Sequence, residues 1–151
     1  MNPAFLSVGK FKFHWGTRTY VMGILNVTPD SFSGDGLLAQ VEADDPLRST
    51  LDQARRFLAA GCDILDVGGE STRPGSQPVD ADAEKQRVIP VIESLVREFP
   101  DALISIDTYK AEVAEAALKA GALIVNDVWG LRGDPDLAAV AARHNAPVIL
   151  M

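Results

Sequence analysis

The sequence predicts an α/β fold with a parallel sheet. Five apolar runs alternate with segments whose apolar residues recur at helical spacing. The runs are apolar almost throughout, which is typical of strands that are covered by helices. Two units also echo one another, since residues 60–66 read AGCDILD and residues 120–126 read AGALIVN. Repeated strand–helix units favour a parallel α/β sheet.

The first elements are predicted by turn residues and by apolar spacing. The N-terminal segment is expected to form a hairpin with Gly16 near its turn. Apolar residues spaced i, i+4, i+7 and i+11 predict helices that include residues 47–58 and 88–99, with Pro46 and Asp82 near their starts. Val113 with Ala117 indicates a third helix.

Helix ends complete the pattern. Gly61 and Gly121 stand where the first and third helices are expected to stop, and Asp134 with Pro135 marks the start of a fourth. The predicted strands between these helices are residues 20–27, 62–67, 102–107, 122–127 and 146–151.

Five strands and four helices fit two architectures. One is a flavodoxin-like open sheet, and the other is the first half of a (β/α)8 barrel, which needs about 250 residues when whole. Periodicity does not choose between them. The 151 residues end on a predicted strand at Met151, with no helix to cover it. We therefore expect residues 1–151 to be the N-terminal part of a single larger domain.

Composition excludes several classes of protein. There are 14 Lys and Arg against 21 Asp and Glu, a net charge of −7, which argues against nucleic acid as the main partner. No apolar run approaches the length of a membrane span, and the N-terminus does not resemble a secretory signal. Cys62 is the single cysteine, so a cytoplasmic location is expected.

Polar residues stand at the expected ends of successive strands. They are Asn26, Asp66, Asp107, and Asn126 with Asp127. Each could simply cap a helix or form a turn. In a barrel, however, these strand ends converge on one pocket, where Asn and Asp side chains could hold a polar heterocycle such as a pterin or a purine.

Two loops follow the first two strands of the predicted sheet. NVTPDSFSGDG (26–36) and GGESTRPG (68–75) are rich in Gly, Ser and Pro, and both are candidate lids. Arg73 could bind a phosphate or a carboxylate, or could pair with Glu70. No phosphate-binding P-loop, dinucleotide fingerprint, CxxC or HExxH motif occurs in the sequence.

Four segments carry a resemblance to a known family. MGILNVTPDSFSGDG (22–36) and DILDVGGESTRPG (63–75) resemble the two signature segments of the dihydropteroate synthases, the sulfonamide targets of folate biosynthesis. ISIDT (104–108) and IVNDVWG (124–130) are similar to that family as well. The resemblance implies a (β/α)8 TIM barrel, of which this chain would cover about the first half, strands 1–5.

The resemblance also implies an activity. Members of the family are transferases that join 4-aminobenzoate to (7,8-dihydropterin-6-yl)methyl diphosphate, release diphosphate and use Mg²⁺. They are commonly homodimers. The later strands of the family supply further pterin and diphosphate ligands that are not found here, so the chain as given is expected to be an inactive fragment.

Site residues are carried over by matching motif positions. Asn26 corresponds to the asparagine that holds the metal and the diphosphate. The first loop reads SFSGDG where SFSDGG is commoner, which leaves the placement of Asp35 open. Thr72, Asp107 and Asn126 correspond to pterin contacts, and Phe32, Arg73 and Pro74 lie in loops that close over the site and shape the aminobenzoate pocket.

The expected mechanism uses no covalent nucleophile. Loss of diphosphate leaves positive charge on the pterin methylene, and an ionised Asp107 beneath the ring would stabilise it. The oxygen of Asn26 would bind Mg²⁺ together with diphosphate oxygens. Three alternatives are a methyltetrahydrofolate-binding methyltransferase domain, a non-catalytic half-barrel interaction module and a flavodoxin-like binding protein.

Overall fold

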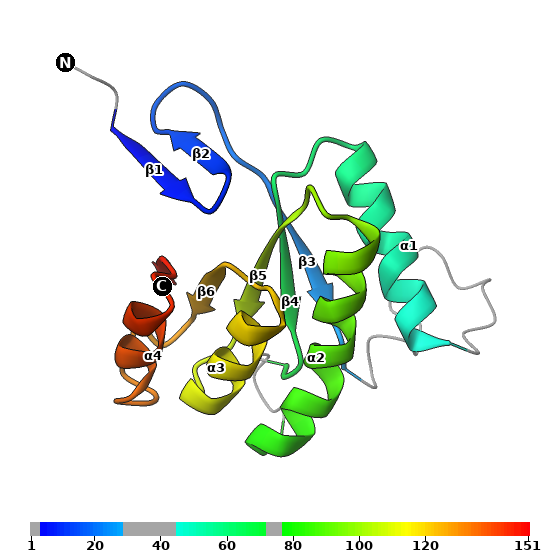
Figure 1. Ribbon diagram of the computed structural model, residues 1–151. Helices are drawn as coiled ribbons and strands as arrows, with labels where there is room; N and C mark the ends of the chain where they lie inside the picture. The colour runs from blue at the N-terminus through cyan, green and yellow to red at the C-terminus, as the bar shows by residue number, and fades with distance from the viewer. Residues whose placement is uncertain (1–3, 29–44, 72–76) are drawn as a thin grey trace.

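The computed structural model describes residues 4–28, 45–71 and 77–151 (Figure 1). The chain opens with an antiparallel hairpin and continues as alternating parallel strands and helices. The elements, in order, are β1 (Phe5–Val8), β2 (Phe11–His14), β3 (Met22–Asn26), α1 (Pro46–Ala59), β4 (Ile64–Gly68), α2 (Ala81–Glu98), β5 (Leu103–Asp107), α3 (Ala111–Ala120), β6 (Ile124–Asp127), α4 (Leu137–Arg143) and β7 (Val148–Leu150).

The order of the parallel strands decides between the two predicted architectures. The sheet runs β3-β4-β5-β6-β7, so every strand pairs with its neighbours in the sequence. A flavodoxin-like sheet reverses direction after its first strand and has the order 2-1-3-4-5. A sheet without such a reversal is the order of a (β/α)8 barrel, and this chain contains about half of one. The flavodoxin-like alternative is therefore wrong.

The predicted helix ends are confirmed with small shifts. Asp45 caps α1 by accepting hydrogen bonds from two backbone N–H groups of its first turn. Asp80 caps α2, two residues before the Asp82 of its first turn. Gly61 follows α1 with a φ of 88°, and Gly121 ends α3 with a φ of 116°, both in the left-handed region that favours glycine.

The hairpin is confirmed, but its turn lies earlier than predicted. Val8 pairs with Phe11, which leaves Gly9 and Lys10 as the two turn residues. Gly9 has a φ of 54°, as a tight two-residue hairpin turn requires. Gly16 follows β2 rather than lying near the turn. The sequence offered two glycines in this segment, and apolar alternation alone did not distinguish between them.

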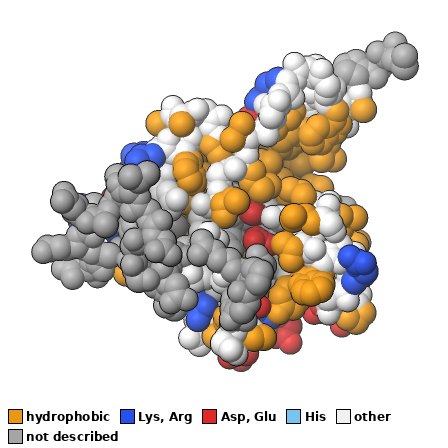
Figure 2. Space-filling view, turned by 180° about the vertical axis from the view of Figure 1, so that it is seen from behind, with side chains coloured by type: hydrophobic (Ala, Val, Ile, Leu, Met, Phe, Trp, Pro, Cys, Tyr) orange, Lys and Arg blue, Asp and Glu red, His pale blue; other side chains and the backbone are white. Residues whose placement is uncertain are grey.

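The two faces of the sheet have different partners. Helices cover one face, and a large apolar cluster there includes Leu25, Leu65 and Ile106. The hairpin covers the other face at the amino ends of the strands. A second cluster joins Val8 and Phe13 of the hairpin to Ile64, Leu103 and Ile124 of the sheet. Figure 2 shows hydrophobic side chains gathered between the hairpin and the sheet.

The carboxyl ends of the strands point away from the hairpin (Figure 1). The apolar cluster under the hairpin occupies the amino end of the interior face, so any polar interior site lies at the carboxyl end. In the part of the chain that the structure describes, no helix is both long and apolar enough to cross a membrane.

Candidate functional site

Strand register places four polar side chains on one interior surface. Asp66 of β4 pairs with Ser105 of β5, and one layer further along, Gly68 pairs with Asp107, which pairs with Asn126 of β6. Side chains two residues apart on a strand lie on the same face. We call Asp66, Ser105, Asp107 and Asn126 the interior polar cluster.

Three residues of the interior polar cluster, Asp66, Ser105 and Asn126, are buried, and Asp107 is partly exposed. The side-chain amide of Asn126 donates a hydrogen bond of 2.9 Å to Oδ2 of Asp66, which is only 2% exposed. Three other buried atoms have no hydrogen-bond partner among the described residues: Oδ1 of Asp66, Oγ of Ser105 and Oδ1 of Asn126. Buried polar groups are nearly always satisfied in folded proteins, so this concentration of unpaired atoms marks a functional region.

Burial and surrounding carboxyl groups raise the pKa of Asp107 to about 7. Desolvation is the largest cause, and the charge of Asp66 is the next, followed by Glu84, Asp127 and Glu70. Burial also raises the pKa of Asp66, and the hydrogen bond from the amide of Asn126 offsets only part of this rise. The protonated form of Asp107 is therefore favoured far more than in a free carboxyl group, whereas the expected mechanism uses the ionised form.

Gly68 provides the space beside Asp107. A Cβ atom at this position would lie 3.4 Å from Oδ2 of Asp107, in close contact with it. Gly68 pairs with Asn26 on one side and with Asp107 on the other. The carboxyl edge of β3, β4 and β5 therefore has two polar side chains with no side chain from Gly68 between them.

A second group of charged side chains lies at the same end of the sheet. Lys110 donates hydrogen bonds to the carboxylates of Glu70 and Glu84, and the hydroxyl of Tyr109 approaches Glu70 at 3.3 Å. Burial lowers the pKa of Lys110, but the hydrogen bonds to the two carboxylates outweigh it and leave the pKa raised. We call Glu70, Glu84 and Lys110 the paired charge cluster. It joins the segment after β4 to α2 and to the start of α3.

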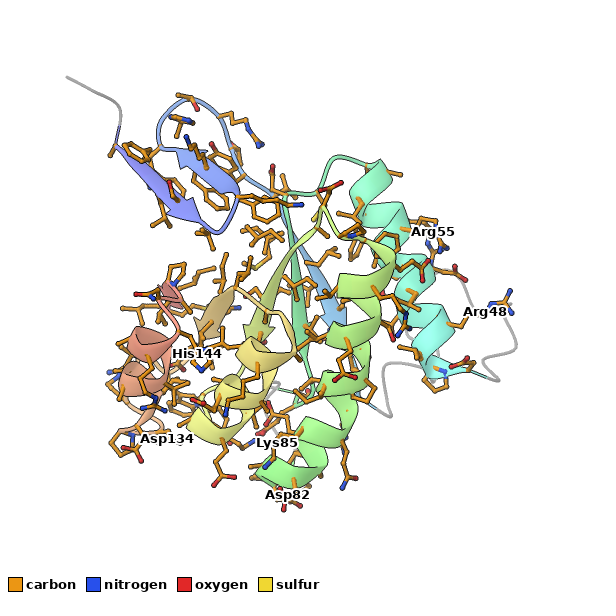
Figure 3. The ribbon with its side chains drawn as sticks, viewed as in Figure 1. Arg48, Arg55, Asp82, Lys85, Asp134 and His144 are labelled. Atoms are coloured by element: carbon orange, nitrogen blue, oxygen red, sulfur yellow. The ribbon has the colours of Figure 1, made fainter. Side chains whose placement is uncertain are left out.

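Two further aspartates have structural roles at the same end. Asp127 accepts hydrogen bonds from the backbone N–H groups of Trp129 and Leu131, at 2.8 and 2.6 Å, and so fixes the turn after β6. Asp134, labelled in Figure 3, accepts a bond of 2.8 Å from the N–H of Ala111, the first residue of α3. The turn role of Asp127 is one that the sequence left open, whereas Asp134 was expected to mark the start of the fourth helix and instead bonds to the first residue of α3.

Asn26 ends β3 with an exposed side chain. Its amide oxygen is the kind of hard donor that Mg²⁺ prefers, and Mg²⁺ commonly keeps waters and takes phosphate oxygens from a substrate rather than a full set of protein ligands. No group of three or more His, Cys, Asp or Glu side chains suited to a metal occurs in residues 4–28, 45–71 and 77–151. Among the described residues, Asn26 is the side chain that the resemblance assigns to a metal.

The predicted site residues are brought together in part. Asp107 and Asn126 lie side by side, and Asn26 ends a strand at the same edge of the sheet. Asp66 lies in the middle of β4 rather than at its end. Glu70 pairs with Lys110. The remaining predicted residues, Phe32, Thr72, Arg73 and Pro74, lie outside the described residues.

Several polar residues of this region were not predicted as site residues. Ser105 could have been found from its spacing, because it lies two residues before Asp107 on the same strand. Glu84 occupies an apolar position of α2, four residues before the buried Val88, which is a recognisable signal for a paired buried charge. Lys110 carries no comparable signal, since it precedes a helix like many exposed lysines.

Comparison with known proteins identifies the class of the chain. Residues 22–151 match the family of pterin-binding enzymes. The chain therefore belongs to that family.

The relatives within the family are dihydropteroate synthases. The protein from Bacillus subtilis is 53% identical over 134 residues, which are 89% of this chain and 45% of that protein. The synthase from Synechocystis is 50% identical over 149 residues, or 99% of this chain and 49% of that protein. A solved structure of the Clostridium difficile synthase, in the presence of pteroic acid, is 54% identical to this chain with a TM-score of 0.80. The match covers 90% of this chain and 49% of the chain in that structure. The chain thus spans about half the length of the relatives that it matches.

Proposed function

We propose that this chain contributes to a dihydropteroate synthase and supplies the pterin-binding part of its active site. The observation that carries the proposal is the interior polar cluster, in which Asp107 and Asn126 lie side by side over the buried Asp66. A pterin ring has several N–H donors and acceptors on one edge, and a desolvated carboxyl beside an amide is complementary to such an edge. The identity of about 50% to dihydropteroate synthases supports the same substrate.

The proposed reaction is a substitution at carbon. The amine nitrogen of 4-aminobenzoate forms a bond to the pterin methylene carbon, the bond from that carbon to the diphosphate oxygen breaks, and the amine loses a proton. Positive charge develops on the pterin as diphosphate leaves. Ionised Asp107, buried in a site of low dielectric constant, would stabilise that charge far more strongly than water does.

The pKa of Asp107 gives this mechanism a pH dependence. Because the useful form is the ionised one and the pKa is about 7, turnover should fall as the pH decreases below 7. The Asn26 oxygen would hold the metal side of the substrate. Mg²⁺, when bound, would offset the negative charge of the diphosphate leaving group. A homodimeric assembly and a cytoplasmic location belong to the same proposal.

The decisive assay measures product. The protein expressed from its own gene is incubated with the pterin diphosphate, labelled 4-aminobenzoate and Mg²⁺, and we expect labelled 7,8-dihydropteroate. Asp107→Asn should lower turnover by about 100-fold or more, since it removes the charge that stabilises the transition state. Asp101→Asn is the matched control, because that side chain is 93% exposed at the opposite end of β5.

Two results would contradict the proposal. Wild-type protein that forms no dihydropteroate but binds methyltetrahydrofolate would support the methyltransferase alternative. Near-normal turnover by Asp107→Asn would leave the reaction in place but remove the role given to this carboxylate.

A further inference from the structure

Asp66 is a buried carboxyl group without a neighbouring cation. It is 2% exposed, and within the described part of the chain it forms no ion pair; its hydrogen bond comes from the neutral amide of Asn126. The adjacent interior layer of the same sheet holds Ile64 and Leu103, and Ile124 lies beside Ser105 in the layer of Asp66 itself. A carboxyl group in such a position is costly to bury, so stability alone does not account for it.

The hydrogen bond from Asn126 gives Asp66 a specific effect. A side-chain amide can rotate by half a turn with little change in shape, which exchanges its donor and acceptor ends. An ionised carboxylate is an acceptor only, so Asp66 selects the orientation in which Nδ2 faces it. Oδ1 of Asn126 is then left without a donor among the described residues. The amide thereby retains one unused acceptor.

Asp66 acts on Asp107 as well. The two carboxyl groups lie on adjacent strands, one interior layer apart. The charge of Asp66 is the second largest cause of the raised pKa of Asp107, after burial. Glu84, Asp127 and Glu70 act in the same direction, but Glu84 and Glu70 share the cation of Lys110, and Asp127 is held by two N–H groups of its turn.

We propose that Asp66 is a positioning residue of this site, which orients the amide of Asn126 and makes the ionisation of Asp107 depend on the charge of what binds beside it. The proposal rests on the proposed function only in treating Asn126 and Asp107 as ligand-binding side chains. A ligand that gains positive charge would favour the ionised form of Asp107, and a neutral ligand would not.

The first test needs no ligand. The Asp107 carboxyl carbon is titrated by nuclear magnetic resonance in the wild-type chain and in Asp66→Asn, which keeps the shape and can still accept from Asn126. We expect the midpoint for Asp107 to fall by about one pH unit in the variant. Asp63→Asn is the matched control, because this aspartate lies just before β4 at the amino end, where it pairs with Arg18. An unchanged Asp107 midpoint in Asp66→Asn would overturn the coupling.

The second test follows the amide. In the wild-type chain, one side-chain N–H proton of Asn126 should show a through-hydrogen-bond coupling to the Asp66 carboxyl and slow exchange with water. Asp66→Leu should lose both signals, and Asp66→Asn should retain slow exchange through its own carbonyl oxygen. If Asp66→Leu does not fold, the coupling and the exchange rate in the wild-type chain still decide whether Asp66 holds the amide. Fast exchange in wild type would overturn the orienting role.

The third test uses pteroic acid as the probe. Asp66→Leu should bind it about tenfold more weakly than wild type, because it leaves the amide of Asn126 without its acceptor, and Asp63→Asn should bind it equally well. Equal binding by Asp66→Leu would overturn the positioning role at the ligand. Failure of the wild-type protein to bind pteroic acid would count against the proposed function instead, and the two ligand-free measurements would still decide the role of Asp66.

Discussion

Two fully buried carboxyl groups at the carboxyl end of the sheet have opposite surroundings. Glu84 is 1% exposed and bonded to Lys110, whereas Asp66 is 2% exposed and bonded to an amide. Pairing with a cation removes most of the cost of burying a charge, and an amide removes much less. The comparison indicates that Glu84 holds the fold together, and that Asp66 is retained because the site needs it.

The same contrast extends to the residues around each carboxyl group. The paired charge cluster joins three segments that are far apart in the sequence, the end of β4, α2 and the start of α3. The interior polar cluster lies on three adjacent strands that already pair through their backbones. Its side chains therefore contribute little to joining elements, and they remain available to a ligand.

Removal of the cation should have the largest effect. Lys110→Met leaves two carboxylates facing each other in a buried region, and we expect the free energy of unfolding to fall by about 3–5 kcal/mol. Urea unfolding at pH 7 measures this change. Lys119→Met is the control, because Lys119 is 67% exposed in its pair with Glu115 and its loss should cost about 1 kcal/mol or less. Equal losses in the two variants would refute the distinction between the clusters.

Neutralising Asp107 should raise the free energy of unfolding rather than lower it. Its pKa is about 7 when folded against 3.8 for the free group, so ionisation destabilises the fold progressively from pH 4 to pH 7. Asp107→Asn avoids this penalty and should be more stable than wild type at pH 8, by up to about 4 kcal/mol. The advantage should shrink as the pH is lowered toward 4. Unfolding curves at several pH values test the expectation, and a wild-type fold that becomes more stable as the pH rises would contradict it.

Two adjacent glycines, Gly68 at the end of β4 and Gly69 after it, should distinguish the two clusters by smaller changes in stability. A Cβ at Gly69 would lie 2.8 Å from Val88 of α2, but a Cβ at Gly68 would meet Asp107 at 3.4 Å. Gly69→Ala should therefore lower the free energy of unfolding by about 1–3 kcal/mol, through forced repacking against α2. Gly68→Ala should cost less in stability and should disturb the titration of Asp107 instead. The reverse order of the two losses would count against this assignment.

The fold was predictable because its signals are local. Apolar runs such as residues 102–107 and stops such as Gly121 depend on neighbouring residues alone, and both were placed within one residue. The choice between a barrel and an open sheet could not be made from local signals. It depends on which strands pair, and the resemblance to a family supplied what periodicity lacked.

The site was predictable only where its residues end strands. Asp107 and Asn126 were found from that position, and register brings them together. The contact between Asp66 and Asn126 joins residues 60 positions apart and depends on the relative register of strands, which no spacing in the sequence reveals. The raised pKa of Asp107 could not be read from the sequence for a related reason, since it combines burial with the charges of four other carboxyl groups.

The sequential order of the parallel strands has a consequence for how this architecture can be assembled. Each strand–helix unit is placed on the one before it, and nothing that follows needs to be inserted between units already in place. Such a sheet can grow by addition at one edge, as repeat proteins do, where each unit interacts mainly with its neighbours. A gene encoding one such unit could therefore lengthen by duplication, with every intermediate keeping the same inner surface at the carboxyl ends of its strands.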